Sequence, residues 1–491
     1  MSDQSLNWLI IVDVTYVAIL VVTAIRIIWD TTATHKTLAY LLLVFFVPIF
    51  GVLFYFSFGV NYRKRKVYSK KLIKDDQLRR RVIRQIITRS EANLRAYRER
   101  IGNATGLARL LLNSSISPLT IGNRVRVLVN GEEKFPEVLE SLRSARHHIH
   151  LEYYIYEEGE IGNEIAEVLM AKAREGVKVR VIYDAFGSRG LRRRFIRDLR
   201  SAGVEVFPFN RIHFAPLANR LNYRNHRKII VVDGATGFVG GLNISDRYAN
   251  YTPRLGRRPE VFWRDTHVRI DGPGVMHLQY LFFCDWNFCA KQDLAPDADY
   301  FPLKRFPGGE ESVQIAASGP DSPASTIMLS MAKAINLARR EILISTPYFI
   351  PGETILNAIR VAALSGVSVK ILAPGLSDSR LVNAAAWSYY DDLLSAGVEI
   401  YLYRKGFIHA KSMVVDDNLA VVGTANMDYR SFELNFEVNA VVYSEGVART
   451  LREIFMEDLK DAERIDPVTW RERTIFKQIP EKMARLLSPL L

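Results

Sequence analysis

Two long apolar runs lie at the start of the chain. Residues 7–29 are long enough to cross a bilayer, although Asp13 and Arg26 interrupt them near the two ends. Residues 38–60 carry no charged side chain, and as a helix they would extend about 34 Å, against a hydrocarbon core of about 30 Å. The pattern predicts two transmembrane helices within residues 1–60, arranged as a hairpin. The alternatives are a cleavable signal peptide, which would need a basic start and a small-residue cleavage site, and a buried soluble hairpin.

Further along, strand-like runs alternate with helical runs, and the whole series occurs twice. The segment EGVKVRVIYDA at 175–185 returns as SGVSVKILAPG at 365–375. This alternation predicts an α/β fold in which helices cover a sheet in each of two halves. We place the first half at 111–290 and the second, with a C-terminal tail, at 324–491. A segment rich in Pro, Gly and Asp at 291–323 is the expected linker.

Charge is concentrated directly after the apolar runs. The 491 residues carry a net charge of +13, and residues 61–100 alone hold 15 Lys or Arg and 4 Asp or Glu, a net +11. By the positive-inside rule, this stretch and both termini lie in the cytoplasm. Its apolar periodicity predicts a basic juxtamembrane helical segment at 61–110 that attracts anionic lipids. A topology signal alone is the alternative. We exclude nucleic acid as a partner, because the charge adjoins a membrane span and the two halves are nearly neutral.

Two further segments admit two interpretations each. The first half has an insertion of 11 residues around 210–222, which could line a substrate entrance or form a plain surface loop. The tail at 470–491 mixes apolar and basic side chains, so it could enter a membrane interface or pack on the catalytic region. Cys284 and Cys289 lie among aromatic residues without a metal-binding pattern and suit a reducing compartment.

A repeated polar motif interrupts the two halves. The pattern H-x-K-x4-D occurs twice with a constant offset of 183 residues, and each copy is followed by glycine and then asparagine. In a strand, residues i and i+2 share a face, so each copy points its histidine and lysine the same way. A neutral imidazole can attack phosphorus or move a proton, and an ammonium can hold phosphate oxygens. One such pair would be unremarkable, but packing gives no reason to repeat the whole set. The motif residues are His226, Lys228, Asp233 and Asn243 in the first copy and His409, Lys411, Asp416 and Asn426 in the second.

At these residues the sequence resembles the phospholipase D superfamily, whose signature is two H-x-K-x4-D motifs closed by G-[SGT]-x-N. Within it, the two apolar spans, ASGPD at 317–321 and the LLSPLL terminus resemble bacterial cardiolipin synthases. The resemblance covers essentially the whole chain. It implies two α/β sandwich halves, related by a pseudo-twofold axis that brings both motifs into one site, behind an N-terminal transmembrane hairpin.

Two acids on later strands complete the expected site. Asp265 and Glu437 follow the first and second motifs at corresponding places. The resemblance implies that each orients the histidine of the opposite half, Glu437 for His226 and Asp265 for His409. An acid that caps a strand end is the alternative. We count Asp233 and Asp416 with the catalytic motif, although their place at a turn favours a bracing role.

The resemblance also implies a reaction. One histidine, which we expect to be His226, attacks the phosphorus of phosphatidylglycerol, and His409 transfers protons. The lysines and asparagines hold the phosphate oxygens, so no metal or cofactor is expected. A second phosphatidylglycerol then accepts the phosphatidyl group, which yields cardiolipin and glycerol. A phospholipase D-type hydrolase, a phosphatidylserine synthase and a non-catalytic lipid-binding scaffold remain as alternatives. The expected surroundings are phosphatidylglycerol and anionic lipids in a bacterial plasma membrane, and a homo-oligomer stays open.

Overall fold

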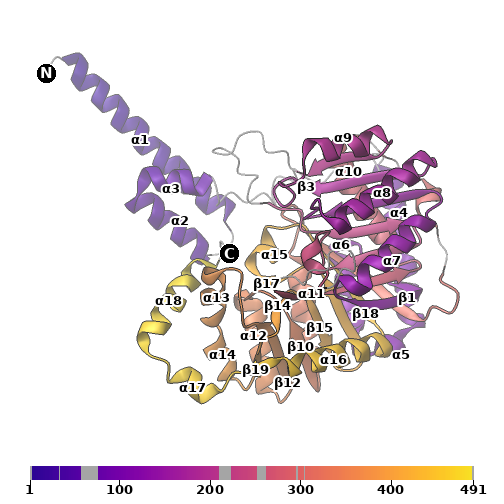
Figure 1. Cartoon of the computed structure of the whole chain (residues 1–491). Helices are drawn as coiled ribbons and strands as arrows, with labels where there is room; N and C mark the ends of the chain where they lie inside the picture. Colours follow the sequence, from indigo (N-terminus) through magenta and orange to yellow (C-terminus); the bar gives the residue numbers. More distant parts are fainter. Residues whose placement is uncertain are drawn as a thin grey trace. The chain divides into compact units, whose positions relative to one another are not determined.

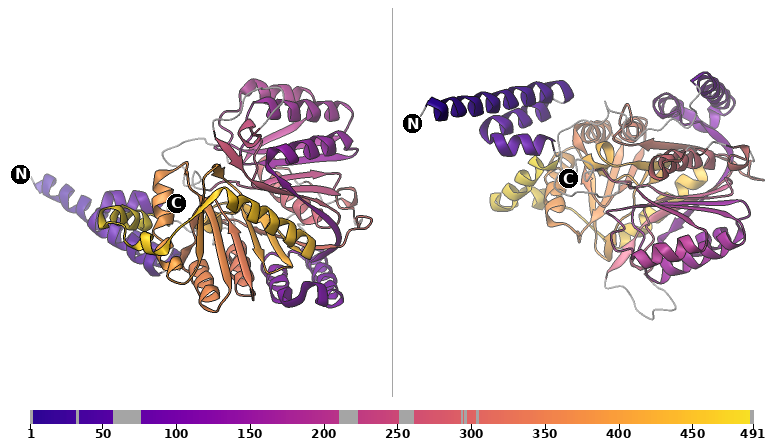
Figure 2. Two further views of the ribbon diagram at one scale, coloured as in Figure 1. Left: turned by 60° about the horizontal axis from the view of Figure 1, so that its bottom comes forward. Right: turned by 90° about the horizontal axis from the view of Figure 1, so that it is seen from above.

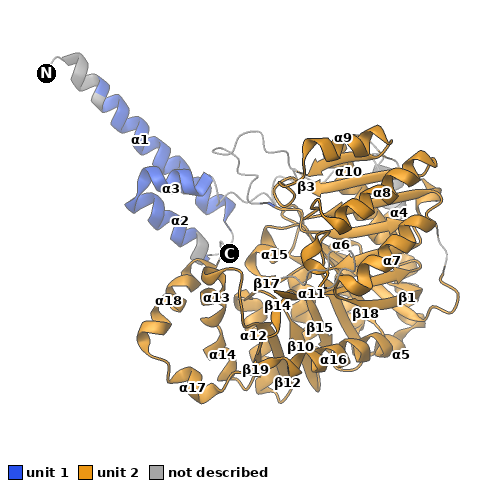
Figure 3. Ribbon diagram, viewed as in Figure 1, with its two compact units in different colours: residues 1–68, 210–223 blue, residues 69–209, 224–491 orange. Residues whose placement is uncertain are grey.

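A computed structural model describes most of the chain: residues 3–31, 34–56, 76–209, 223–250, 261–292, 294, 297–302 and 305–488. The chain divides into two compact units (Figure 3). The smaller unit comprises residues 1–68 and 210–223, and the larger comprises residues 69–209 and 224–491. The insertion expected at 210–222 lies outside the described residues, so its role stays a prediction.

The smaller unit begins with one long apolar helix, α1 (Asp3–Asp30). Within the described residues it is the one helix with the length and composition to cross a membrane, over Ile10–Asp30. The uninterrupted helix expected at 38–60 is wrong. That stretch forms α2 (Thr34–Phe46) and α3 (Pro48–Phe54), separated at Val47, because a proline lacks the N–H that would continue the helix. The transmembrane hairpin is therefore not confirmed.

The helices of the smaller unit pack on one another near the end of α1. Ile27, Val44 and Tyr55 are buried together, one from α1, one from α2 and one just beyond α3. The Tyr55 hydroxyl lies 3.4 Å from the Arg26 carbonyl oxygen, to which it donates a hydrogen bond. These contacts hold the two short helices against α1 (Figure 1).

Three helices lead into the first strand of the larger unit: α4 (Asp76–Ala96), α5 (Arg98–Ile101) and α6 (Thr105–Ser115). The last turns of α4 are fixed, because Asn93 Nδ2 donates to the Leu119 carbonyl oxygen at 2.8 Å and Ser90 Oγ accepts from the Leu119 N–H at 3.0 Å. Residues 61–75 of the basic segment expected at 61–110 lie outside the described residues. Its placement along a membrane surface stays a prediction.

Within the described residues, the first half supplies seven strands to the main sheet and four α-helices. The strands are β1 (Thr120–Val129), β2 (His148–Tyr153), β3 (Lys178–Asp184), β4 (Glu205–Phe209), β5 (Lys228–Val232), β6 (Thr236–Gly240) and β8 (Thr266–Asp271). The helices are α7 (Asn130–Ser144), α8 (Glu160–Arg174), α9 (Arg193–Ser201) and α10 (Val275–Ala290). Helices cover both faces of the sheet, as the alternating side chains of β5 show. Ile230 and Val232 face the core under α7 and α8, while Ile229 and Val231 face the core under α10.

The second half repeats this plan and adds a tail. Its strands in the main sheet are β9 (Glu311–Ser318), β10 (Glu341–Ser345), β12 (Ser368–Pro374), β13 (Glu399–Tyr403), β15 (Ser412–Val415), β16 (Leu419–Gly423), β18 (Glu437–Tyr443) and β19 (Ala462–Arg464). Its helices are α11 (Thr326–Ile335), α12 (Gly352–Leu364), α13 (Arg380–Trp387), α14 (Tyr390–Leu394), α15 (Tyr429–Glu433), α16 (Glu445–Lys460), α17 (Pro467–Arg471) and α18 (Ile475–Leu486). Figure 2 shows α16 lying along the strands of this half.

All these strands join in one sheet, whose order is β19-β13-β12-β10-β15-β16-β18-β9-β1-β8-β6-β5-β2-β3-β4. Read outward from the central β9–β1 pair, the order of one half matches that of the other, strand for strand, as far as β13 and β4. The central strand β9 lies inside the range 291–323 that we expected to be a linker. Its residues Val313, Ile315 and Ala317 alternate into the core shared by both halves, so this part of the segment is structural.

The halves also exchange short segments close to the two motifs. β7 (Phe262–Arg264) pairs in parallel with β14 (Gly406–Ile408), directly before His409. On the other side, Asn225 forms a parallel bridge with Phe436, directly before Glu437. A further small pairing, within the second half, joins β11 (Phe349–Ile350) to β17 (Met427–Asp428). Each motif is thus anchored by backbone from the opposite half.

Candidate active site

The two histidines take their backbone positions from the opposite half. The His226 N–H donates to the Phe436 carbonyl oxygen at 3.0 Å, and the His409 N–H donates to the Arg264 carbonyl oxygen at 2.7 Å. Because Phe436 and Arg264 directly precede the two expected acids, the same backbone bonds set the distance between each histidine and its acid. The position of each histidine thus depends both on the strand spacing of its own motif and on a backbone hydrogen bond to a residue far away in sequence.

Each histidine contacts the acid of the other half. His226 Nδ1 lies 2.9 and 3.0 Å from the two carboxylate oxygens of Glu437, and His409 Nδ1 lies 2.7 Å from Asp265 Oδ2. Both acids are fully buried, and about a tenth of each histidine side chain is exposed. An Nδ1–H that donates to a carboxylate leaves Nε2 as the nitrogen for chemistry. This is the pairing that the resemblance implies.

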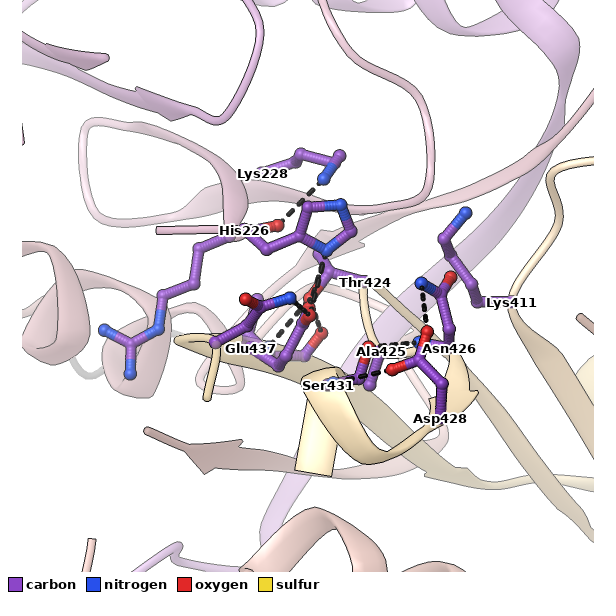
Figure 4. Close-up of polar contacts among 12 residues, drawn as sticks. His226, Lys228, Lys411, Thr424, Ala425, Asn426, Asp428, Ser431 and Glu437 are labelled. Carbon is purple, nitrogen blue, oxygen red and sulfur yellow. Dashed lines mark hydrogen bonds and ion pairs between the residues drawn. The ribbon is translucent and has the colours of Figure 1, made fainter. Parts of the chain in front are cut away.

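The two lysines make matching contacts. Lys228 Nζ donates to the His226 carbonyl oxygen at 2.8 Å, and Lys411 Nζ donates to the His409 carbonyl oxygen at 2.5 Å. Burial lowers the pKa of Lys228 to about 7 and that of Lys411 to about 8. In Figure 4 the side chains of Lys228 and Lys411 flank the ring of His226. The site thus brings two buried ammonium groups to the same place, and an anion would stabilise both.

Burial also sets the state of the rings. It lowers the pKa of His226 to about 4, with Glu437 opposing and Lys228 adding to the shift. It lowers the pKa of His409 to about 3, reinforced by Lys411 and opposed by Asp265. Lys411 also acts on His226, and Lys228 on His409, so the two motifs lie within electrostatic reach of one another. Both rings are neutral at pH 7 in the empty site, as a nucleophile or a general base must be.

The two asparagines occupy similar turns with different partners. Asn243 accepts a hydrogen bond from the Ile155 N–H at 3.2 Å and donates to the Tyr248 hydroxyl. Asn426 Nδ2 donates to Asp428 Oδ2 at 3.1 Å, while its Oδ1 is buried without a hydrogen-bond partner in the described part of the chain. Each amide group retains one N–H beyond these bonds, so either can donate to a phosphate oxygen.

The structure places the two motif aspartates away from the histidines. Asp233 and Asp416 lie beyond the far ends of β5 and β15, about 16 Å along an extended strand from the lysine at the near end. The carboxylate of Asp233 accepts from the N–H groups of Arg146, His147 and His148, and that of Asp416 from those of residues 339–341. Both have a left-handed backbone, with φ of 51° and 50°. Counting them as catalytic is therefore a weaker interpretation than a bracing role for a turn.

Several side chains beyond the two motifs and their acids lie at the site. Glu437 accepts hydrogen bonds from Thr424 Oγ1 and, at 3.1 Å, from Asn435 Nδ2, which fix the carboxylate that faces His226. Tyr154 packs edge-on against His226, with ring centroids 4.9 Å apart, and Trp263 lies 5.4 Å from His409 by the same measure. The T in GTAN was the available signal for Thr424, since a threonine there can reach the acid on the neighbouring strand.

The first motif differs from the second at the position of Thr424. Its equivalent is Gly241, and a Cβ atom there would lie 2.1 Å from Asp265 Oδ1. The Asp265 carboxylate is instead fixed by the Thr266 N–H, which donates to Oδ1 at 2.7 Å. The glutamate thus needs a side-chain hydroxyl to hold it, whereas the shorter aspartate needs an adjacent residue without a side chain.

Comparison with known proteins agrees with this geometry. A family model described as "Cardiolipin synthase, PLD-like domain" matches residues 138–252 and again 331–459, one match in each half. A second model, "Phospholipase_D-nuclease N-terminal", matches residues 18–59. The cardiolipin synthase of a Geobacillus species is 43% identical over 463 residues, which is 93% of this chain and 89% of the relative. The chain belongs to the cardiolipin synthase family.

Other family members give the same result over the full length. The cardiolipin synthase of Alkalihalophilus pseudofirmus is 38% identical over 99% of this chain and 95% of its own. The major cardiolipin synthase of Bacillus subtilis is 42% identical over 92% and 93%. Among solved structures, a phosphatidylserine synthase from Haemophilus influenzae is similar with a TM-score of 0.60 over 79% of this chain and all of its own, at 16% identity. That likeness is one of fold. The family consists of membrane-associated phosphatidyltransferases that act on phospholipids, and this chain belongs to it. The apolar helix α1 is consistent with association with a membrane.

Proposed function

We propose that this protein joins two phosphatidylglycerol molecules into cardiolipin and releases glycerol. The observation that carries the proposal is the pair of exchanged contacts, His226 with Glu437 and His409 with Asp265. Each supplies a neutral ring with its Nδ1 engaged and its Nε2 available, so the site holds two equivalent reactive nitrogens. A transfer in two displacement steps needs one nitrogen on phosphorus and one that moves protons.

In the first step, His226 Nε2 attacks the phosphorus of the donor lipid. The new P–N bond forms as the bond between phosphorus and the glycerol headgroup oxygen breaks. His409, protonated at Nε2, gives its proton to that oxygen, and free glycerol leaves. Glu437 stabilises the positive charge that develops on the His226 ring, because its carboxylate lies against Nδ1.

In the second step, His409 Nε2 takes a proton from the terminal glycerol hydroxyl of the acceptor lipid. That oxygen attacks phosphorus, the P–N bond breaks, and cardiolipin leaves with His226 neutral again. His409 ends protonated, as it began, so no proton is gained or lost over the cycle. We assign the nucleophile to His226 from the family resemblance.

The positive charge that the transition state needs comes from Lys228 and Lys411, with Asn243 and Asn426 as further donors. In the empty site, burial lowers the pKa of both lysines, and repulsion by Lys411 adds to the shift of Lys228. A bound phosphodiester brings a negative charge within reach of all four basic groups and raises their pKa values. We propose that in the complex both lysines are charged and His409 holds a proton while His226 stays neutral, the form that the first step requires.

The finer parts of the architecture are proposals as well. Strand order that repeats outward from β9 and β1 supports a pseudo-twofold axis between the halves. The net +11 over residues 61–100 supports a cytoplasmic catalytic unit, and the family match over 18–59, which includes α2 and α3, supports a second membrane-inserted element after α1. We retain the homo-oligomer and the domain boundaries as predictions.

A product assay tests the reaction. The extracted protein is incubated with radiolabelled phosphatidylglycerol without added metal, beside His226→Ala and His409→Ala, and the lipids are separated. We expect cardiolipin and equimolar glycerol from the wild type and neither product from the variants. Phosphatidic acid as the main product would make the protein a hydrolase. Equal turnover by wild type and both variants would overturn the site.

A further inference from the structure

The tail helix α18 has its apolar side on the outside. Around a helical turn of 100° per residue, its large apolar side chains fall within an arc of about 120°. All are exposed: Ile475 (64%), Phe476 (83%), Ile479 (49%), Met483 (60%), Leu486 (73%) and, directly after the helix, Leu487 (42%). A surface helix of a water-soluble domain normally turns this stripe inward. This stripe therefore faces a medium other than the protein core.

The inward side of α18 buries Glu481 and the small Ala484 and is well held. Glu481 is buried there and accepts from Arg473, with Nη1 at 2.7 Å and Nη2 at 2.9 Å. Arg485 lies over the ring of Tyr389, 4.2 Å from its centroid, and pairs with Asp392 at 3.2 Å. Because the helix is fixed by these contacts, its exposed apolar stripe is not the result of a frayed chain end.

α18 packs on α13, and α13 continues from a loop at the edge of the active site. In that loop, Asp378 Oδ2 accepts from the Tyr348 hydroxyl at 2.6 Å, and Asp378 also acts on the pKa of Lys411. Leu376 and Leu381 lie on either side of Asp378 and are 58% and 45% exposed. We call residues 375–381, which include the first two residues of α13, the rim loop. Its exposed leucines extend the apolar surface from α18 toward the two motifs.

The first half has an exposed apolar side chain at the equivalent place. With the offset of 190 that aligns EGVKVRV with SGVSVKI, Phe186 corresponds to Leu376. It is 40% exposed, and the guanidinium of Arg224 lies 3.9 Å from its ring centroid. Arg224 is two residues before His226. Each half thus carries an exposed apolar residue beside the site, and neither side chain is buried in the protein core.

The charge of α18 suits an anionic surface. Its 12 residues hold Lys477, Lys482 and Arg485 against the one buried acid Glu481. Lys477 and Lys482 are exposed. Basic residues that flank an apolar stripe are the composition of helices that lie in the headgroup layer of anionic bilayers.

We propose that α18 and the rim loop together form a docking surface for an anionic lipid bilayer, with α18 lying in the headgroup layer. The apolar stripe enters the acyl boundary, the lysines meet anionic headgroups, and the leucines of the rim loop bring that boundary to the site. The surface would deliver lipid substrates from the same leaflet that it binds. The proposal goes beyond the reaction and concerns binding, which can be measured in an inactive protein.

Lipid contact is tested with the full chain, one copy per phosphatidylglycerol nanodisc, in a background with Cys284→Ala, Cys289→Ala and His226→Ala. A fluorophore is attached at Phe476→Cys or, as control, at Glu457→Cys on α16, whose side chain is 72% exposed. Lipids carrying a nitroxide near the headgroup should quench the first label at least threefold more than the second. Equal quenching of the two labels would overturn the proposal. It would also be overturned if the label at 476 were protected from solvent only in discs that hold two copies, because a second copy would then cover α18.

A kinetic test separates docking from folding and from catalysis. Phe476→Ser, Met483→Ser and Leu486→Ser are combined in one variant. The control combines Val361→Ser and Leu364→Ser on α12, which are 59% and 70% exposed in the wild type. The α18 variant should turn over bilayer phosphatidylglycerol at least tenfold more slowly, yet turn over a dispersed short-chain analogue within twofold of wild type. An unchanged bilayer rate, or an equal loss in the α12 control, would contradict the assignment to α18.

Discussion

Glu437 and His226 come from different halves of the chain, and the Glu437 carboxylate lies 2.9 Å from His226 Nδ1. The carboxylate is fully buried and also binds Thr424 and Asn435. Its position is therefore fixed before substrate arrives, and the ring is held with Nε2 facing the site. A side chain so placed orients and charges the histidine without contacting the lipid itself.

Glu437→Gln should preserve the fold and remove most of the activity. The amide keeps the shape but can neither enforce the tautomer nor stabilise an imidazolium, so kcat should fall about 10³- to 10⁴-fold. The lipid KM should change little, and the pH profile should lose the limb that reports the histidine. Steady-state kinetics from pH 5 to 9 measure both. A loss of less than fivefold with an unchanged profile would show that the acid only caps a strand.

The second position of each G-x-x-N segment gives a matched pair of variants. Thr424→Val removes one hydrogen bond to Glu437, which costs about 1 kcal/mol and lowers kcat about fivefold to tenfold. Gly241→Ala should abolish activity, because the new Cβ would lie 2.1 Å from Asp265 Oδ1 and displace the partner of His409. Activity assays with circular dichroism as a control for folding measure this. Similar losses in both variants would contradict the asymmetry between the two acids.

Asp233→Asn should affect stability more than catalysis. Its carboxylate holds three backbone N–H groups at a turn whose φ is 51°, and loss of the charge weakens those bonds by about 1 to 3 kcal/mol. The melting temperature should fall, while kcat at a temperature where the protein is folded stays within threefold of wild type. Asp416→Asn should behave in the same way. A large fall in kcat with an unchanged melting temperature would make these residues catalytic after all.

Lys228→Met should inactivate the protein and stabilise it at neutral pH. The lysine pKa is 10.5 when exposed and about 7 in the fold, so the unfolded chain binds more protons between these values. Folding therefore becomes more favourable for the wild type as pH rises from 7 to 10.5. The variant does not bury an ionisable group at this position, so its free energy of unfolding should exceed that of the wild type by about 1 kcal/mol or more at pH 7. This difference should shrink toward pH 10. Thermal unfolding at both pH values measures the gap, and a variant less stable at pH 7 would contradict the cost of burial.

The sequence was sufficient for the features that repeat or that adjoin one another. The doubled H-x-K spacing and the matched strands around it predicted two α/β halves, and the family resemblance paired Glu437 and Asp265 with the opposite histidines. Local pattern was insufficient where distant backbone decides. Thr424 gains its role from a neighbouring strand. The run VQIAA at 313–317 was strand-like in sequence, but the linker assigned to 291–323 included it, and its pairing with β18 places it in the sheet.

At two other places the structure adds what the content of apolar residues alone did not indicate. Hydropathy over 38–60 is uniform, so it predicted one span, but Pro48 divides the stretch into α2 and α3. In the tail, the mixture of apolar and basic side chains left open whether the segment packs on the catalytic region or enters a membrane interface. Only the burial of Glu481 and the exposure of Phe476 establish that the stripe of α18 faces outward.

The central claim is that the two histidines divide the chemistry, with His226 as nucleophile and His409 as the group that moves protons. A phosphatidyl ester of p-nitrophenol tests it most directly, because this leaving group departs without a proton. His409→Ala should release one equivalent of nitrophenol per site in a burst, stop there, and carry the phosphatidyl group on a peptide containing His226. His226→Ala should give no burst. A burst from His226→Ala with the label on His409 would reverse the roles, and no covalent lipid in either variant would contradict the mechanism.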